Sequence, residues 1–126
     1  MYTIHEVCEK TGLSAYTLRY YEKEKLLPSV SRSAGGFRQY SEEDVQALEM
    51  ICRLKSIGMS LQDISRFMTL FREGDKTLGE RCEMLRRHRD AVIVRLEDMK
   101  KQLDIVKREV DFFSEKLEEY EQKKKA

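Results

Sequence analysis

The sequence predicts a mainly α-helical protein in which a small winged helix-turn-helix domain is followed by one long helix. Apolar residues recur at helical spacing along most of the chain. A stretch rich in glycine and serine after the single proline interrupts this pattern between residues 28 and 40. From Leu78 onwards a heptad repeat of apolar residues runs without glycine or proline after Gly79. We therefore divide the 126 residues into a domain over 1–75, a long helix over 76–120 and a charged tail over 121–126.

The charge of the chain is balanced, since 24 Lys and Arg residues stand against 23 Asp and Glu residues. The net charge of +1 excludes a uniformly basic chromatin-type protein, so any nucleic-acid surface must be local. No apolar run approaches the roughly 18 residues that a membrane span needs. The first residues also lack the basic and apolar regions of a signal peptide. We expect a cytoplasmic protein with no membrane partner.

Two short helices are predicted at the N-terminus. Thr3 caps the first helix, which ends at Thr11, and Glu6 completes a capping box three residues later. Ser14 caps the second helix, which runs to about Lys25. Two helices joined by a three-residue turn with glycine have the outline of a helix-turn-helix, although an ordinary helical hairpin shares this spacing.

A β-hairpin is predicted to follow, over about 28–40. Pro28 ends helical structure, and two short extended arms flank Ala34-Gly35-Gly36. A hairpin directly after a helix-turn-helix is a wing. A phosphate-binding P-loop is excluded because no Lys-Ser/Thr follows the glycines.

Two further helices complete the predicted domain. Ser41 caps the third, with Asp44 three residues later, and Gly58 fits its C-terminal end. Ser60 caps the fourth, which ends near Gly74. The inward-facing residues are predicted to be Val45, Leu48, Ile51, Cys52 and Leu54 in the third helix, and Leu61, Ile64, Phe67, Met68 and Phe71 in the fourth.

The long helix carries a seam at alternating steps of four and three residues, which is the heptad pattern of a coiled coil. The seam comprises Leu78, Cys82, Leu85, Arg89, Val92, Leu96, Met99, Leu103, Val106, Val110, Phe113, Leu117 and Tyr120. A domain of some 70 residues cannot cover a seam of this length, so it needs a partner helix, most simply from a second copy. The alternative is a charged single helix packed back on its own domain. Heptads alone fix neither the direction nor the number of the helices.

Arg89 alone breaks the apolar seam. Arg89 could fix the register of the coiled coil or take part in an ion pair. Alternatively, its aliphatic side chain could extend so that the guanidinium lies at the edge of the seam.

Basic, tyrosine and hydroxyl side chains gather between Ser14 and Tyr40, and this mixture binds phosphates and reaches base edges. In a helix-turn-helix the N-terminal residues of the second helix lead into the major groove. The candidates there are Ser14, Ala15, Tyr16, Thr17 and Arg19. The amides at the start of the fourth helix, beside Ser60, could hold a phosphate.

Several linked motifs follow one another in this half of the chain. They are Thr17-Leu18-Arg19-Tyr20-Tyr21-Glu22, Leu26-Leu27-Pro28, Arg32, Gly36-Phe37-Arg38-Gln39-Tyr40, Asp44-Val45 and Leu54-Lys55-Ser56-Ile57-Gly58-Met59-Ser60-Leu61. In this order they resemble the MerR family of bacterial transcription regulators over nearly all of residues 1–75. The resemblance implies a winged helix-turn-helix, an antiparallel coiled-coil dimer, and a pseudo-palindromic operator in an over-long promoter spacer. It also implies that the activated dimer bends and untwists this DNA for RNA polymerase, which is therefore an indirect partner.

The resemblance also assigns residues to the DNA. Arg19 and Tyr20 would contact it from the recognition helix, and Arg38 and Tyr40 from the wing, with Arg32 beside them. Tyr16 and Thr17 are further candidates. The family often has tyrosine where Phe37 stands, so a hydroxyl contact would be missing here.

The sequence gives fewer indications of what the protein senses. Because only six residues follow Tyr120, we expect no separate ligand-binding domain. Metal-sensing members of the family have a cysteine near the position of Cys82, but they complete the site after the long helix, and no cysteine or histidine follows His88. We therefore predict no metal ligands and no cofactor, although Cys82 pairing with Cys52 or Cys8 stays open.

Cys52 resembles the lone cysteine of a family subgroup that responds to aldehydes and other thiol-reactive electrophiles, which implies a stress response. Lys55, one turn on, could stabilise its thiolate, while Glu49, one turn back, opposes this. The alternative is an inert buried cysteine. No nucleophile–base pair or carboxylate constellation indicates an enzyme. Three alternatives remain: a metal-responsive regulator of the same family, an excisionase-like architectural DNA-binding protein, and a coiled-coil scaffold.

Overall fold

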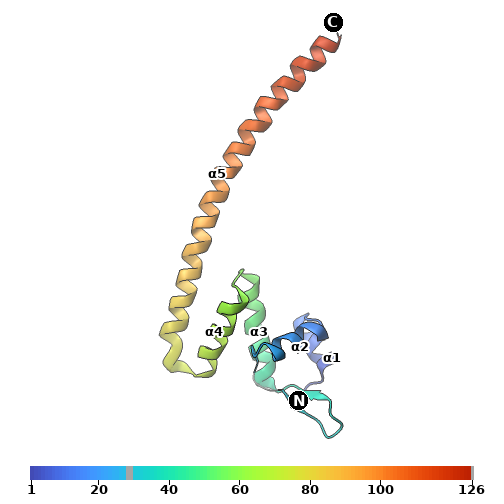
Figure 1. Ribbon diagram of the computed structural model, residues 1–126, viewed down its shortest axis with the longest axis vertical. Coiled ribbons are helices and arrows are strands. Elements are labelled where there is room, and N and C mark those ends of the chain that lie inside the picture. The colour runs from blue at the N-terminus through green and yellow to red at the C-terminus, as the bar shows by residue number, and fades with distance from the viewer. Residues whose placement is uncertain (28–29, 126) are drawn as a thin grey trace. The chain divides into compact units, whose positions relative to one another are not determined.

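Residues 1–27 and 30–125 are described by the computed structural model of the protein (Figure 1). They form two units, one over residues 1–84 and one from Leu85 along the remainder of the long helix. The first unit contains α1 to α4, a two-stranded hairpin and the first turns of α5. The predicted beginning of the wing at residue 28 lies outside the described residues.

The first two helices are α1 (Ile4–Thr11) and α2 (Ala15–Lys23). The predicted capping box is confirmed, because the backbone N–H of Glu6 donates to Thr3 Oγ1 at 3.2 Å and that of Thr3 donates to Glu6 Oε1 at 3.1 Å. Ser14 caps α2 with its side chain alone, which accepts from the Thr17 N–H. This helix ends two residues before the predicted Lys25, which has a left-handed backbone with φ 61°.

The hairpin pairs β1 (Ser31–Arg32) with β2 (Arg38–Gln39) in antiparallel register. Gly36 lies in its turn with φ 84°, a conformation that costs glycine little. At the base of the hairpin, the backbones of Tyr2 and Tyr40 exchange hydrogen bonds of 2.7 and 2.8 Å. The hairpin is therefore fastened to the N-terminus of the chain.

The next two helices are α3 (Glu42–Ser56) and α4 (Leu61–Arg72). The end of α3 is a Schellman motif, in which Met59 N–H donates to Leu54 C=O and Gly58 N–H to Lys55 C=O. Gly58 takes the left-handed position of that motif, with φ 81°.

The core of the first unit is built from all of these elements. It contains Val7, Leu18, Tyr21, Leu26, Leu27, Val30, Tyr40, Val45, Leu48, Ile51, Leu54, Met59, Ile64, Phe67 and Met68. One predicted core residue is wrong, because Leu70 is buried and Phe71 is 36% exposed. The Phe71 ring lies instead 5.5 Å from the Arg81 guanidinium at the edge of the domain.

A 3-10 turn over Asp75–Thr77 leads directly into α5 (Leu78–Lys125). Residues 121–125, predicted to be a charged tail, are therefore helical. The 48 residues of α5 span about 72 Å at 1.5 Å per residue. Among its described residues none is buried, so the predicted seam is exposed along the single chain. No helix in the described part of the protein combines the length and apolarity of a membrane span.

Candidate nucleic-acid interface

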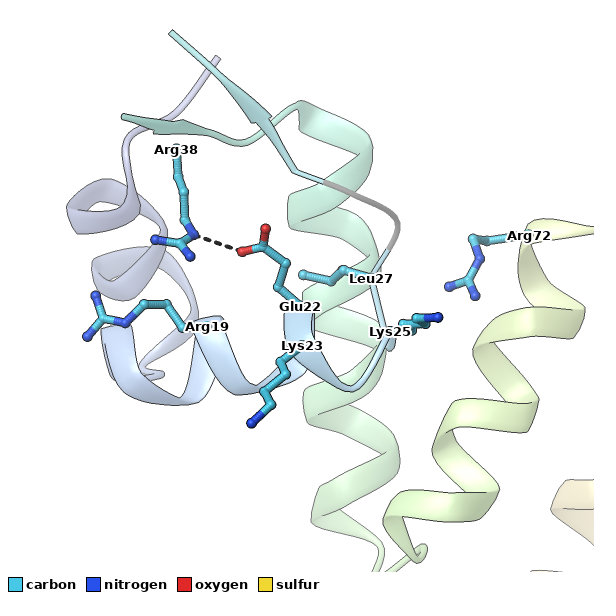
Figure 2. A pocket seen from close by; sticks show the side chains of 7 residues that line it. All are labelled: Arg19, Glu22, Lys23, Lys25, Leu27, Arg38 and Arg72. Atoms are coloured by element: carbon cyan, nitrogen blue, oxygen red, sulfur yellow. Dashed lines mark hydrogen bonds and ion pairs between the residues drawn. The ribbon is translucent and has the colours of Figure 1, made fainter. Parts of the chain in front are cut away.

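A hollow of about 480 Å³ lies between α2, the hairpin and α4, and its charge is strongly positive (Figure 2). Its lining residues are Arg19, Glu22, Lys23, Lys25, Leu27, Arg38 and Arg72. Five of these are basic and one is acidic. This concentration contrasts with the balanced charge of the whole chain and gives the local positive field that a polyanion needs.

A second hollow, of about 340 Å³, shares Arg19 and Arg38 with the first. It opens between the start of α1 and the hairpin, and Arg32 and Phe37 also line it. The two hollows together define one continuous feature, which we call the basic surface. It comprises Arg19, Lys23, Lys25, Arg32, Arg38 and Arg72.

The position of these side chains on α2 follows from the burial of the opposite face. Leu18 and Tyr21 are buried, so helical geometry leaves Arg19 and Lys23, four residues apart, on the exposed side. Figure 2 shows both side chains projecting from α2 away from the core. The exposed face of α2 thus presents the cationic edge that the sequence predicted.

One carboxylate lies inside the basic surface. Arg38 Nε donates to Glu22 Oε2 at 2.8 Å, and both side chains are about a quarter or less exposed. Figure 2 shows this bond joining the hairpin to α2. Because it crosses between two elements, the ion pair fixes the orientation of the wing strand on the recognition helix.

Arg72 belongs to the basic surface but was not among the predicted site residues. Its Nη1 donates to Leu26 C=O at 3.1 Å, which joins the end of α4 to the chain that follows α2. The sequence gives only a weak indication that Arg72 belongs to the site. Arg72 lies four residues after the buried Met68, at the edge of the apolar stripe, and only the packing of α4 brings it near α2.

A smaller hollow of about 250 Å³ joins the N-terminal ends of α2 and α4. Tyr16, Thr17, Tyr20 and Lys55 line it, and Lys55 Nζ lies 3.4 Å from the hydroxyl of Tyr21. Tyr16 is highly exposed and Tyr20 partly so. The predicted residues of the recognition helix therefore come together with a lysine from α3 that the site prediction omitted.

The two predicted serines act first as helix caps. Ser14 Oγ accepts from the Thr17 N–H, and Ser60 Oγ accepts from the Asp63 N–H, both at 3.1 Å. Both serines are exposed at the ends of helices that border the smaller hollow. The carboxylate of Asp63 in the first turn of α4 opposes the phosphate site predicted beside Ser60.

The tip of the wing is exposed. Phe37 is 76% exposed, and Arg32 Nη1 donates to Gly36 C=O at 3.2 Å across the turn. An exposed aromatic ring at a loop tip, beside an arginine, is a surface feature that favours contact with another molecule.

Tyr40 corrects the sequence prediction. Its side chain is 0% exposed, so it belongs to the core and not to the surface on which the sequence placed it. Its hydroxyl has no hydrogen-bond partner within the described residues. Burial raises the pKa of this phenol, and the nearby Glu22 carboxylate raises it further.

Cys52 lies on α3 and is half-buried beside the core residue Ile51. Burial raises the pKa of its thiol, and this outweighs the opposing effect of Lys55, while Glu49 adds to the rise. The expectation that Lys55 stabilises the thiolate is therefore only partly met. Cys8 is also half-buried and Cys82 is exposed, and no group of three His, Cys, Asp or Glu side chains suited to a metal occurs among residues 1–27 and 30–125.

Comparison with protein families gives two matches. The family model described as "MerR HTH family regulatory protein" matches residues 2–70, and that described as "MerR, DNA binding" matches residues 45–106. An HTH-type transcriptional regulator of Haemophilus influenzae is 39% identical over 112 residues, which are 89% of this chain and 83% of that protein. The regulator AdhR of Bacillus subtilis is 40% identical over 90 residues, which are 71% of this chain and 64% of AdhR.

A similar architecture occurs in the crystal structure of HiNmlR, which is described as a MerR family regulator lacking the sensor domain, bound to promoter DNA. It is 42% identical, has a TM-score of 0.65, and the match covers 82% of this chain and 78% of HiNmlR. All of these relatives are transcriptional regulators rather than enzymes.

Proposed function

Because the chain belongs to the MerR family of helix-turn-helix transcriptional regulators, we propose that it acts as a homodimer that binds a pseudo-palindromic promoter operator. By distorting that DNA, the dimer controls where RNA polymerase can initiate transcription. The basic surface is the single observation that carries this proposal. In a chain of net charge +1, it concentrates six cationic side chains around α2 and the hairpin.

In the proposed complex, α2 enters the major groove. Tyr16, Thr17 and Arg19 lie at its leading end, where base edges and flanking phosphates are reached together. Tyr20 and Lys55 hold the phosphates beside the smaller hollow. The wing follows the backbone with Arg32, Arg38 and the exposed ring of Phe37. HiNmlR, a relative of similar fold, is a regulator bound to promoter DNA, which supports this assignment.

Dimerisation is proposed through α5. Its seam residues from Leu85 to Leu117 are exposed in the single chain, and burial of such a stripe in a coiled coil is favourable in free energy. Two winged domains joined in this way would read two half-sites of an operator, since the symmetry of the protein then matches that of the DNA. A dimer that grips two half-sites can bend and untwist the DNA between them.

The proposed effector is a thiol-reactive electrophile such as an aldehyde, with Cys52 as the sensing residue. Cys52 adjoins Ile51 and lies one turn from Lys55, so an adduct would change packing within α3 and beside the smaller hollow. The raised pKa of the thiol means that only a small fraction is thiolate at neutral pH. With so little thiolate, Cys52 should react slowly and should respond to an abundant electrophile rather than to trace amounts.

The DNA-binding proposal is tested by footprinting and in vitro transcription on the promoter of the protein's own or a neighbouring gene. We expect protection of a site with two related half-sites and a change in transcript level. Failure to protect any such site, with protein that is folded by circular dichroism, contradicts the proposal.

The effector proposal needs a separate experiment on the same promoter, comparing the unsubstituted protein with Cys52→Ser. If both proteins bind the operator but only the unsubstituted protein changes transcription with a reactive aldehyde, Cys52 is the sensor. If both respond equally, the sensing assignment is wrong while the DNA-binding proposal is unaffected.

A further inference from the structure

From Leu85 onward, the described part of α5 carries a heptad seam whose side chains are exposed. Its first series of seam positions, conventionally called a, holds Arg89, Leu96, Leu103, Val110 and Leu117. Its second series, called d, holds Leu85, Val92, Met99, Val106 and Phe113. All of these side chains are exposed. The positions flanking the seam, e and g, carry the charges that select partner and orientation in coiled coils.

We propose that this seam is occupied by α5 of a second copy in one specific antiparallel register, in which Arg95 pairs with the partner's Glu109 and Arg89 stacks on the partner's Phe113. The inference rests on the proposed dimer and adds its register. In this register the facing seam pairs are Leu85 with Leu117, Arg89 with Phe113, Val92 with Val110, Leu96 with Val106, and Met99 with Leu103, each across the two copies.

Charge excludes the parallel arrangement. Two parallel helices in register would place Arg89 against the partner's Arg89 inside the seam. They would also place Arg95, at a g position, beside the partner's Lys100, at the next e position. Like charges in these places destabilise the pairing, and the first pair would also be desolvated. The antiparallel arrangement separates the two arginines at position 89.

Charge also selects among the antiparallel registers. Antiparallel coiled coils face a with d, and g with g, so registers differ by whole heptads. In the proposed register Arg95 meets the partner's Glu109 twice, by symmetry. A shift of one heptad in one direction brings Arg86 beside the partner's Lys107, and a shift in the other direction brings Arg95 beside the partner's Lys116. Each shift removes the two attractive Arg95–Glu109 pairs and introduces two repulsive ones. In the second shift the contact of Arg86 with the partner's Glu121 is attractive, but Lys100 then also meets the partner's Lys107.

Arg89 acquires a role in this register. Its guanidinium is held by Asp90 at 3.0 Å within the same helix, so its charge is already partly balanced. The ring of Phe113 is 62% exposed in the single chain. A guanidinium over an aromatic face is attractive, and more so when both are desolvated. A shift of one heptad in one direction would face Arg89 with Val106, which has no aromatic ring, so this contact favours the proposed register over that one. Between Leu85 and Leu117, one like-charge contact remains in this register, that of Lys100 with the partner's Lys100.

The test is charge reversal in the full-length protein, with the dimer dissociation constant measured by sedimentation after dilution. Arg95→Glu and Glu109→Arg should each raise this constant on the order of tenfold or more, because two attractive pairs become repulsive. The double variant restores opposite charges and should return to within about threefold of the unsubstituted protein. Lys101→Glu, which makes the same charge change on the outer face of the helix, is the matched control and should have little effect.

The outcomes separate the register from the dimer. If the two single effects add in the double variant, or if neither single variant weakens the dimer, the register is wrong although the dimer stands. If the unsubstituted protein sediments as a monomer at micromolar concentration, both the register and the proposed dimer are overturned.

Discussion

Arg19 is the residue on which the two hollows of the basic surface converge. It projects from the exposed face of α2 and lines both of them, together with Arg38. Arg38 is already paired with Glu22, whereas no carboxylate pairs with the Arg19 guanidinium within residues 1–27 and 30–125. Arg19 is therefore best placed to contact the DNA directly.

We predict that Arg19→Ala weakens promoter binding by roughly 1–3 kcal/mol, or about five- to 150-fold. Truncation removes the contact without touching the core, so thermal stability should stay close to that of the unsubstituted protein. Fluorescence anisotropy with labelled promoter DNA measures the affinity. Arg108→Ala, on the outer face of α5, removes the same charge and is the control. Equal losses in the two variants would mean that net charge matters and the position of Arg19 does not.

Tyr40 gives a prediction about stability. Its buried hydroxyl lacks a partner in the described structure, and such a group costs about 1 kcal/mol or more. Tyr40→Phe should therefore raise the free energy of unfolding by about 1 kcal/mol and leave DNA affinity unchanged. Urea denaturation measures the first and anisotropy the second. A large loss of DNA affinity in a stable variant would show that the hydroxyl reaches the DNA after all.

The same phenol makes stability depend on alkaline pH. Its pKa in the folded protein is raised above the unfolded value of about 10. Below about pH 10 the phenol is neutral in both states, so its ionisation does not affect the free energy of unfolding. As the pH rises from the unfolded pKa towards the folded pKa, the unfolded chain ionises first, so the free energy of unfolding falls. Tyr40→Phe should show a smaller loss of stability between pH 9 and 11 than the unsubstituted protein.

Cys52 should react with iodoacetamide more slowly than an ordinary cysteine at neutral pH, because burial holds its pKa high. The rate should rise with pH, with a midpoint above that of the same thiol in the urea-unfolded chain. Mass spectrometry of the modified peptide gives both rates. A midpoint below the unfolded value would mean that Lys55 dominates and that the thiol is activated.

Among the elements, the junction between α4 and α5 depends on one hydroxyl. Thr77 is buried, and its Oγ1 lies 2.6 Å from Leu70 C=O and 2.9 Å from Gly74 C=O, while it accepts from Arg81 Nε at 3.0 Å. This one side chain satisfies polar groups from the end of α4 and the first turns of α5. It therefore joins the end of α4 to the first turn of α5 within the N-terminal unit.

Thr77→Val keeps the volume but removes these hydrogen bonds, so it should lower the free energy of unfolding by about 1–3 kcal/mol. Thr77→Ser retains the hydroxyl and should lose much less. Chemical denaturation of both variants provides the comparison. Equal losses would assign the effect to packing of the threonine methyl group and not to the hydroxyl.

Element boundaries were largely predictable because local chemistry determines them. Thr3 with Glu6, and Ser41 with Asp44, form capping boxes whose every partner lies within three residues in sequence. The errors occur where distant parts decide. The exposure of Phe71 is such a case, because its ring lies against Arg81 in α5. The end of α2 is an exception, because the left-handed backbone of the nearby Lys25 accompanies it. Nothing in residues 121–125 breaks a helix, and α5 continues through these charged residues to Lys125.

At the scale of the whole molecule, the candidate site could be predicted only in part. Arg19, Arg32 and Arg38 were named from motifs, and all three line the basic surface. Arg72 was not named, because α4 reaches α2 only through the tertiary fold. Tyr40 was named as a surface contact but is buried, because a motif does not tell whether a tyrosine faces solvent or the core.

The whole molecule combines two functions that the sequence separates clearly. The N-terminal unit carries the basic surface, and α5 carries the exposed seam. In the proposed dimer each function needs the other, because one winged domain alone covers only half of a palindromic operator. Dilution below the dimer dissociation constant should therefore weaken DNA binding cooperatively.

The most direct test of the central claim is the salt dependence of promoter binding by the unsubstituted protein. Release of counterions makes the logarithm of the binding constant fall linearly with the logarithm of the salt concentration, with a slope of about −0.9 for each phosphate contacted. Two basic surfaces in a dimer predict a slope steeper than about −5. A slope near zero, or binding that is equally strong on unrelated DNA at high salt, would contradict the claim that the basic surface binds the promoter.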